Sequence, residues 1–146
     1  MSSPTSALLM KSHWAELLIR GEKCWELRSS ATAKRGRIAL AVSGAQTLLG
    51  EIDLVDCVQV AEGGRSLLPL PLENFVELHK VPDLANTIRY KRTYAWVMRN
   101  PSRYPTPKPY CHKVGAVIWV SLSTEVQKPK GSDSANAFKK RRTQSK

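Results

Sequence analysis

The eight residues 21–28, which read Gly-Glu-Lys-Cys-Trp-Glu-Leu-Arg, constrain this chain more than any other segment. They place Lys23, Glu26 and Arg28 within a stretch that otherwise looks like a half-buried strand. Because strand side chains alternate between two faces, Glu26 and Arg28 would share one face. An acid and a guanidinium side by side on a core strand indicate either a structural ion pair or a site for a polar ligand.

The same alternation would put Lys23 on the opposite face, with Trp25 and Leu27. This separation would not apply if Lys23 still lies in the turn that precedes the strand. The three charged side chains can converge on one site only in that second case.

Length and charge predict one basic domain with a tail. The chain has 146 residues and a formal net charge of +11. Residues 124–146 carry seven basic and two acidic residues, which leaves residues 1–123 with 16 basic and 10 acidic ones, a net +6. We therefore expect a folded domain over residues 1–123 and a basic, disordered tail over 124–146. A basic folded part favours an anionic partner, of which nucleic acid is the commonest.

Cysteine and histidine spacing indicates neither a disulfide framework nor a metal site. The three cysteines Cys24, Cys57 and Cys111 form no C-x-x-C pair, and the histidines lack metal-ligand spacing. Nothing resembles a dinucleotide or phosphate-loop fingerprint. We expect no metal, no cofactor, no membrane partner and no secretory signal, and hence a cytoplasmic monomer.

The pattern of the early residues predicts a strand, a short helix and a second strand. Residues 7–10 are apolar, and Ser12 is a candidate N-cap for a helix over 13–20. Gly21 then stands where the residue after a helix end belongs.

The remaining chain reads as short strands joined by loops. Residues 29–36 and 62–71 have loop composition, and residues 72–79 favour one or two helical turns. Four prolines in 100–109 argue against any regular structure there. Further strands are expected at 38–42, 48–60 with a bulge at Gly50, 94–98 and 114–122. The fold class is therefore α+β, mostly β: a small barrel with short helices.

Gly21, Lys23, Glu26 and Arg28 match the G-x-K-x-x-E-x-R signature of ASCH domains. These are small β-barrel domains related to the PUA domains of RNA-modifying proteins. Other segments over residues 7–122 also resemble the family: the helix with Trp14, Ala15, Leu17 and Leu18, the run from Arg35 to Ala39, and the closing strand at 115–120.

The resemblance implies a PUA-like barrel with a cleft beside the early helix that binds RNA or a nucleotide. Some members are enzymes, among them a ribonuclease and a branch that resembles an N4-acetylcytidine amidohydrolase. In that branch a Lys and a Thr three positions later are catalytic. Here Lys23 fills the first position but Glu26 replaces the Thr, which argues against the same nucleophile.

We therefore expect binding of RNA, a nucleotide or possibly DNA through a basic cleft beside the octet. Arg28 would contact a phosphate or a base edge, Glu26 would accept from a base amine, and Lys23 would contact a phosphate. Trp14 or Trp25 would offer a stacking face, although core packing is the commoner role of tryptophan. The exposed cations Lys34, Arg35 and Arg37 would either extend the phosphate surface or remain a solvated face.

The alternative is a small hydrolase acting on RNA or a modified nucleoside. In that reading Lys23 and Glu26 are the catalytic residues, with one of them handling a proton. Arg28 would then steady developing negative charge.

Overall fold

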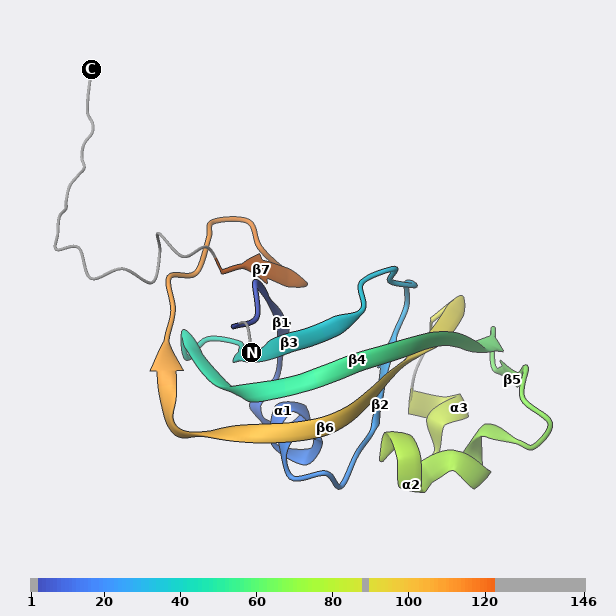
Figure 1. Cartoon of the computed structure of the whole chain (residues 1–146). Coiled ribbons are helices and arrows are strands. Elements are labelled where there is room, and N and C mark those ends of the chain that lie inside the picture. The colour runs from blue at the N-terminus through green and yellow to red at the C-terminus, as the bar shows by residue number, and fades with distance from the viewer. Residues whose placement is uncertain (1–2, 88–89, 123–146) are drawn as a thin grey trace, which may run out of the picture.

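The computed structural model describes residues 3–87 and 90–122 and shows a strongly curved sheet flanked by short helices (Figure 1). The helices are α1 (Ser12–Ile19), the 3-10 helix η1 (Leu72–Phe75), α2 (Val76–His79) and α3 (Leu84–Thr87). The strands are β1 (Ser6–Met10), β2 (Trp25–Arg28), β3 (Gly36–Val42), β4 (Thr47–Glu62), β5 (Arg65–Ser66), β6 (Arg92–Pro109) and β7 (Trp119–Ser121).

The sheet follows the order β2-β6-β4-β3-β1-β7, with the short β5 paired to β4. β1 and β3 run parallel, and the other pairings are antiparallel. The predicted α+β fold, mostly strand with short helices, is confirmed. Over residues 3–87 and 90–122, however, no backbone pairing joins β2 to β7, so the sheet does not close into the expected barrel.

The long ribbon of β4 and β6 dominates the molecule, and it corrects one prediction (Figure 1). The four prolines of residues 100–109 were expected to exclude regular structure, yet β6 continues through them to Pro109. β2 pairs only with residues 94–97, so beyond them β6 is an edge strand with β4 as its partner. Proline is tolerated on an edge strand because its missing N–H breaks no ladder there, and the register shifts between β4 and β6 absorb the irregularity.

The strand expected at 114–122 was too long. Only Trp119–Ser121 forms β7, and the residues before it turn outward, with Val114 and Val117 exposed. The alternating apolar residues before it lie in a loop, whose contacts with the sheet include the packing of Ala116 on the core and the bond from Leu9 N–H to Ile118 O at 2.8 Å.

Helix α1 begins and ends one residue earlier than predicted. Ser12 is its first residue rather than its N-cap, and Lys11 caps the helix without a side-chain hydrogen bond. Gly21 has a φ of +78° and donates its N–H to Leu18 O, the expected helix stop. Gly50 lets the helix approach the ribbon, because a Cβ there would lie 2.4 Å from Ser102 O and 2.7 Å from Ile19 Cδ1.

Two parts of the apolar core decide where the octet lies. The larger part joins α1 to the sheet through Leu18, Leu40, Leu54 and Trp96 among others. The second part attaches the helical segment 72–84 to β2, β4 and β6. It contains Leu27, Val60, Ala61, Leu72, Val81, Leu84 and Ala95.

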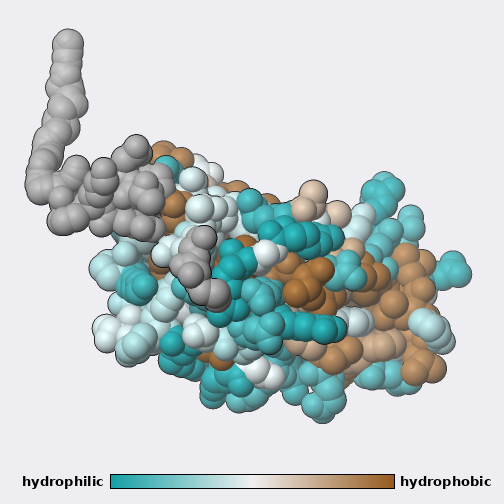
Figure 2. Space-filling view, viewed as in Figure 1, coloured by the Kyte–Doolittle hydropathy of each residue, from teal (hydrophilic) through white to brown (hydrophobic). Residues whose placement is uncertain are grey.

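Figure 2 shows hydrophobic surface gathered at the end of the molecule that carries β5 and α2, where Leu67 and Leu70 are exposed. No helix among the described residues is long and apolar enough to cross a membrane. The basic tail expected over 124–146 lies outside the described residues.

Candidate functional site

Lys23 lies in the turn between α1 and β2, so strand alternation does not govern it. The backbone N–H groups of Glu22 and Lys23 both donate to Leu17 O, and Cys24 N–H donates to Leu78 O. β2 begins only at Trp25. The turn therefore puts the Lys23 side chain on the same side as Glu26, as the convergence of the three charged groups requires.

The Lys23 ammonium is buried, with only 3% of the residue exposed. Its Nζ donates to His79 O at 2.6 Å, lies 3.7 Å from Glu26 Oε1, and sits 4.5 Å from the centre of the Trp14 ring. Burial lowers the pKa of the Lys23 amine, and the nearby Glu26 carboxylate opposes that shift. The amine is thus fixed in place by a carbonyl, a carboxylate and an aromatic face.

Glu26 links the buried lysine to Arg28. Arg28 Nε donates to Glu26 Oε2 at 2.9 Å, and Arg28 Nη2 donates to Leu9 O at 3.0 Å. The guanidinium also lies over the Trp96 ring at 5.5 Å. Because Leu9 belongs to β1 and Arg28 to β2, which are not neighbours in the sheet, this side chain bridges two unpaired strands.

A cavity of about 390 Å³ opens at this bridge. Among the described residues, its charged lining consists of three cations, Lys11, Lys23 and Arg28, against one carboxylate, Glu26. The rest of its wall is apolar, aromatic or hydroxylic, and comes from Leu9, Met10, Trp14, Leu27, Ser43, Val81, Thr87 and Tyr90. The lining therefore combines a surplus of positive charge with one embedded carboxylate.

His79 holds the helical segment against this cavity. Its ring is fully buried, accepts Val81 N–H at Nδ1 (3.0 Å), and lies 3.2 Å from Leu72 O through Nε2. This pair of contacts suits a neutral ring with its hydrogen on Nε2. Burial lowers the pKa of His79, the bond to Leu72 opposes that shift, and the charge of Lys23 reinforces it. One residue thus fixes both Lys23, through its carbonyl, and Val81 in the wall.

Trp25 lies elsewhere. Its ring stacks on Phe75 at 5.5 Å and tilts against His79 at 6.5 Å, and it does not line the cavity. Trp14 does line the cavity, so of the two tryptophans beside the octet it is the one placed to meet a ligand.

The half-buried Lys34 and the exposed Arg35 are also away from the cavity. Lys34 Nζ is 3.3 Å from Ser6 Oγ and 5.0 Å from the centre of the Trp119 ring. Arg35 donates to the carbonyls of Thr32 and Lys34, and lies 3.9 Å from Asp56.

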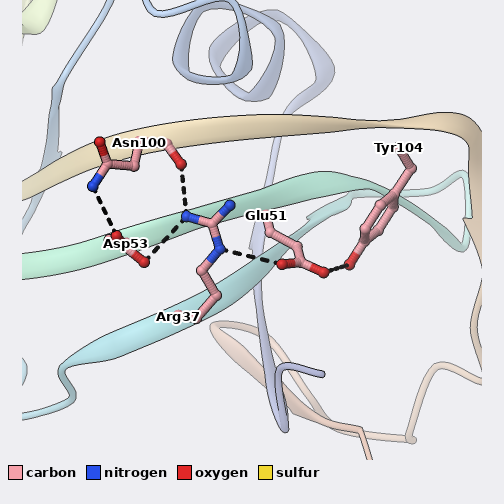
Figure 3. Close-up of polar contacts among 5 residues, drawn as sticks. All are labelled: Arg37, Glu51, Asp53, Asn100 and Tyr104. Carbon is pink, nitrogen blue, oxygen red and sulfur yellow. Dashed lines mark hydrogen bonds and ion pairs between the residues drawn. The ribbon is translucent and has the colours of Figure 1, made fainter. Parts of the chain in front are cut away.

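Arg37 belongs to a separate network that joins β3, β4 and β6 (Figure 3). Its Nε donates to Glu51 at 3.2 Å, and its Nη1 donates to Asp53 at 3.1 Å and to Asn100 O at 2.6 Å. Asn100 Nδ2 donates to Asp53 at 3.0 Å, which together with Arg37 lowers the pKa of that carboxyl. Tyr104 closes the network by donating to Glu51 at 2.8 Å, and its burial raises the pKa of its hydroxyl.

Sequence reasoning missed the far wall of the cavity, formed by Val81, Thr87 and Tyr90. The stretch 82–90 has no clear periodicity, so nothing in it indicated a site. Among residues 3–87 and 90–122, no three His, Cys, Asp or Glu side chains gather as metal ligands would.

The sequence model of the ASCH domain matches residues 8–107. The chain belongs to the ASCH domain family. This family has a PUA-like fold that is associated with RNA binding or hydrolase activity.

The solved structures agree on the fold. An ASCH protein from Zymomonas mobilis superposes with a TM-score of 0.64 at 12% identity, covering 84% of this chain and 90% of that one. Two single-residue mutants of the Zymomonas mobilis protein also superpose, each with a TM-score of 0.61 at 12% identity. They cover 84% of this chain and 92% or 90% of their own. A search of curated proteins finds no match.

Proposed function

We propose that this ASCH protein binds single-stranded RNA, or a nucleotide, in the cavity beside the octet. The observation that carries the proposal is the convergence of Lys23, Glu26 and Arg28 on one cavity of about 390 Å³. That volume falls in the usual range of ligand pockets, about 300–1,000 Å³. Three cations against one carboxylate give the lining a preference for an anionic ligand.

Each part of the lining suits a part of a nucleotide. Lys11 is exposed at the rim and Arg28 is partly exposed, so both are placed to contact a phosphate. Trp14 and Tyr90 supply aromatic surface for a base. Lys23 is already held by His79 O, Glu26 and Trp14, so it contributes positive charge to the lining.

The decisive experiment compares two arginine variants of the full chain by fluorescence anisotropy with labelled single-stranded RNA. Arg28→Met should weaken binding about tenfold, because it removes a charged contact inside the cavity. Arg65→Met is the matched control, since Arg65 is exposed on β5 and does not line the cavity. Affinity should fall steeply with added salt for all three proteins.

Binding alone does not identify the cavity as the site, because residues 124–146 carry a net charge of +5 that would attract any polyanion. The comparison of the two variants does identify it. Equal losses in both variants, or no binding at low ionic strength, would contradict the proposal. A duplex DNA of the same length, measured in parallel, tests the preference for single strands.

One observation favours the hydrolase alternative. Lys23 is a buried amine with a lowered pKa, 3.7 Å from a carboxylate, an arrangement that suits proton transfer. Incubation with N4-acetylcytidine, and separately with single-stranded RNA, tests it. Product that disappears in Glu26→Gln and persists in Glu22→Gln supports catalysis. Turnover that survives in Glu26→Gln rejects the assignment.

A further inference from the structure

Glu26 is the residue that a site for phosphate alone does not explain. It lines the cavity, although it is only 6% exposed, and its negative charge would repel a phosphate. Glu26 pairs with the buried Lys23 and with Arg28, and it also faces the cavity. A ligand that contacts this carboxylate must therefore bring hydrogen-bond donors.

The carboxylate keeps acceptor capacity for a ligand. A carboxylate offers about four lone-pair positions on its two oxygens. Arg28 Nε takes one on Oε2 at 2.9 Å, and Lys23 Nζ approaches Oε1 at 3.7 Å. Room for further donors remains on both oxygens.

Arg28 puts donors next to those acceptors. A guanidinium has five N–H groups and no acceptor. One is used on Glu26 and one on Leu9 O, and the others have no partner within the described part of the chain. The wall thus presents a two-oxygen acceptor beside a donor, in a rigid arrangement that Leu9 O and Trp96 hold from the other side.

Among the four RNA bases, guanine has the complementary edge. Its Watson–Crick edge carries two adjacent donors, the N1–H and the N2 amine, followed by the O6 acceptor. Cytosine and adenine offer an amine beside ring acceptors, and uracil offers one N–H between two carbonyls. Two donors side by side suit a carboxylate, and O6 suits an arginine.

We infer that the cavity takes an unpaired guanine, whose N1–H and N2 amine bond Glu26 and whose O6 accepts from Arg28. This inference rests on the proposed RNA or nucleotide binding and adds the identity of the base. The base must be unpaired, because pairing in a duplex occupies the same edge. The apolar and aromatic wall of Leu9, Met10, Trp14, Val81 and Tyr90 encloses the ring.

The test uses the full chain and five labelled RNA pentanucleotides that differ only at the central position: guanine, inosine, adenine, cytosine or uracil in a uridine background. Guanine should bind about tenfold more tightly than adenine, cytosine or uracil. Inosine keeps O6 and N1–H but lacks the N2 amine, so it should bind with intermediate affinity. Glu26→Gln should remove the preference, and Glu22→Gln, a change at an exposed position of the same octet, should keep it.

The outcomes separate this inference from the proposed function. Equal affinity for all five RNAs, or preference for another base, overturns the guanine assignment and leaves RNA binding standing. Binding to none of them overturns both. If Glu26→Gln fails to fold, the inosine measurement on the unaltered protein decides: inosine that binds as tightly as guanine overturns the assignment.

Discussion

Two arginine–carboxylate clusters, one around Arg37 and one beside the cavity, differ in charge balance. Around Arg37, two carboxylates, Glu51 and Asp53, surround one guanidinium in a network closed by protein groups (Figure 3). Beside the cavity the ratio is reversed, because Lys23 and Arg28 share the single carboxylate of Glu26. The first cluster ties strands together, whereas the second keeps surplus positive charge at a concave surface.

A basic residue therefore indicates an anion site only when protein carboxylates do not already neutralise its charge. The carboxylates around Arg37 outnumber it, so an incoming phosphate gains little there. The cavity cluster has the opposite balance and an adjoining volume of about 390 Å³. Substitutions in the two clusters test separately whether one ties strands together and the other binds an anion.

Gly50→Ala should have the largest effect, because it should destabilise the β4–β6 ribbon that carries the Arg37 network. A Cβ at residue 50 would lie 2.4 Å from Ser102 O and 2.9 Å from Arg103 Cα, both backbone atoms of β6. We expect a loss of about 3 kcal/mol in the free energy of unfolding, measured by urea denaturation. Gly64→Ala is the control, because nothing lies within 4 Å of its Cβ position. Equal stability of the two variants would show that β4 and β6 do not depend on this close approach.

Arg37→Met should lower the free energy of unfolding by about 2 kcal/mol, since it leaves two carboxylates without their shared donor. RNA affinity of the folded variant should stay within about twofold of the unaltered protein, a difference of about 0.4 kcal/mol. Arg35→Met, at an exposed ion pair of 3.9 Å, should change stability by less than about 1 kcal/mol. A stable Arg37→Met protein that binds RNA poorly would assign the wrong role to this cluster.

Arg28→Lys separates charge from geometry, because it keeps the positive charge and removes the planar set of guanidinium donors. One ammonium cannot contact Glu26, Leu9 O and a ligand together, so RNA affinity should fall about fivefold, or about 1 kcal/mol. Arg37→Lys, measured by the same anisotropy assay, should leave the affinity unchanged. An unchanged affinity in Arg28→Lys would mean that charge alone, without geometry, accounts for binding.

Because of His79, the free energy of unfolding should fall as the pH is lowered. Its pKa lies below the usual 6.5, so the unfolded chain binds a proton that the folded chain excludes. The stability that depends on the neutral ring is therefore complete above about pH 6.5 and is lost as pH falls towards the lowered pKa. The slope is at most about 1.4 kcal/mol per pH unit.

Urea denaturation at several pH values between about 5.5 and 7.5 measures this slope. His79→Asn should flatten it, and His13→Asn, at an exposed position, should not. An unaltered slope in His79→Asn would show that another group carries the acid sensitivity. Asp53 has a lowered pKa of its own, so its titration lies at lower pH than this window.

The contacts within the octet could be predicted because the charged residues that make them are close in sequence. Glu26 meets Lys23 three residues before it and Arg28 two residues after it, and Gly21 fixes the turn that puts all three on one side. The α+β class followed in the same way from local periodicity and turn residues. These features depend on short-range geometry, which a sequence displays directly.

The rest depended on distant partners. Arg37 meets Asp53 and Asn100, which lie 16 and 63 residues away, so its local basic neighbours suggested an exposed surface instead. The strand through Pro101 and Pro105 depends on β4 supplying a partner on one side only. Val81 reaches the cavity because His79 accepts its N–H and holds the segment, a contact that no local pattern displays.

The most direct test of the account follows the arginine Nε–H and tryptophan indole signals by NMR while unlabelled single-stranded RNA is added to the full chain. The Arg28 Nε–H and the Trp14 indole should shift together and saturate, because both groups line the cavity, while the Arg37 Nε–H stays unchanged. A shift of the Arg37 signal with Arg28 and Trp14 unmoved would contradict the claim that the cavity beside the octet is the nucleotide site.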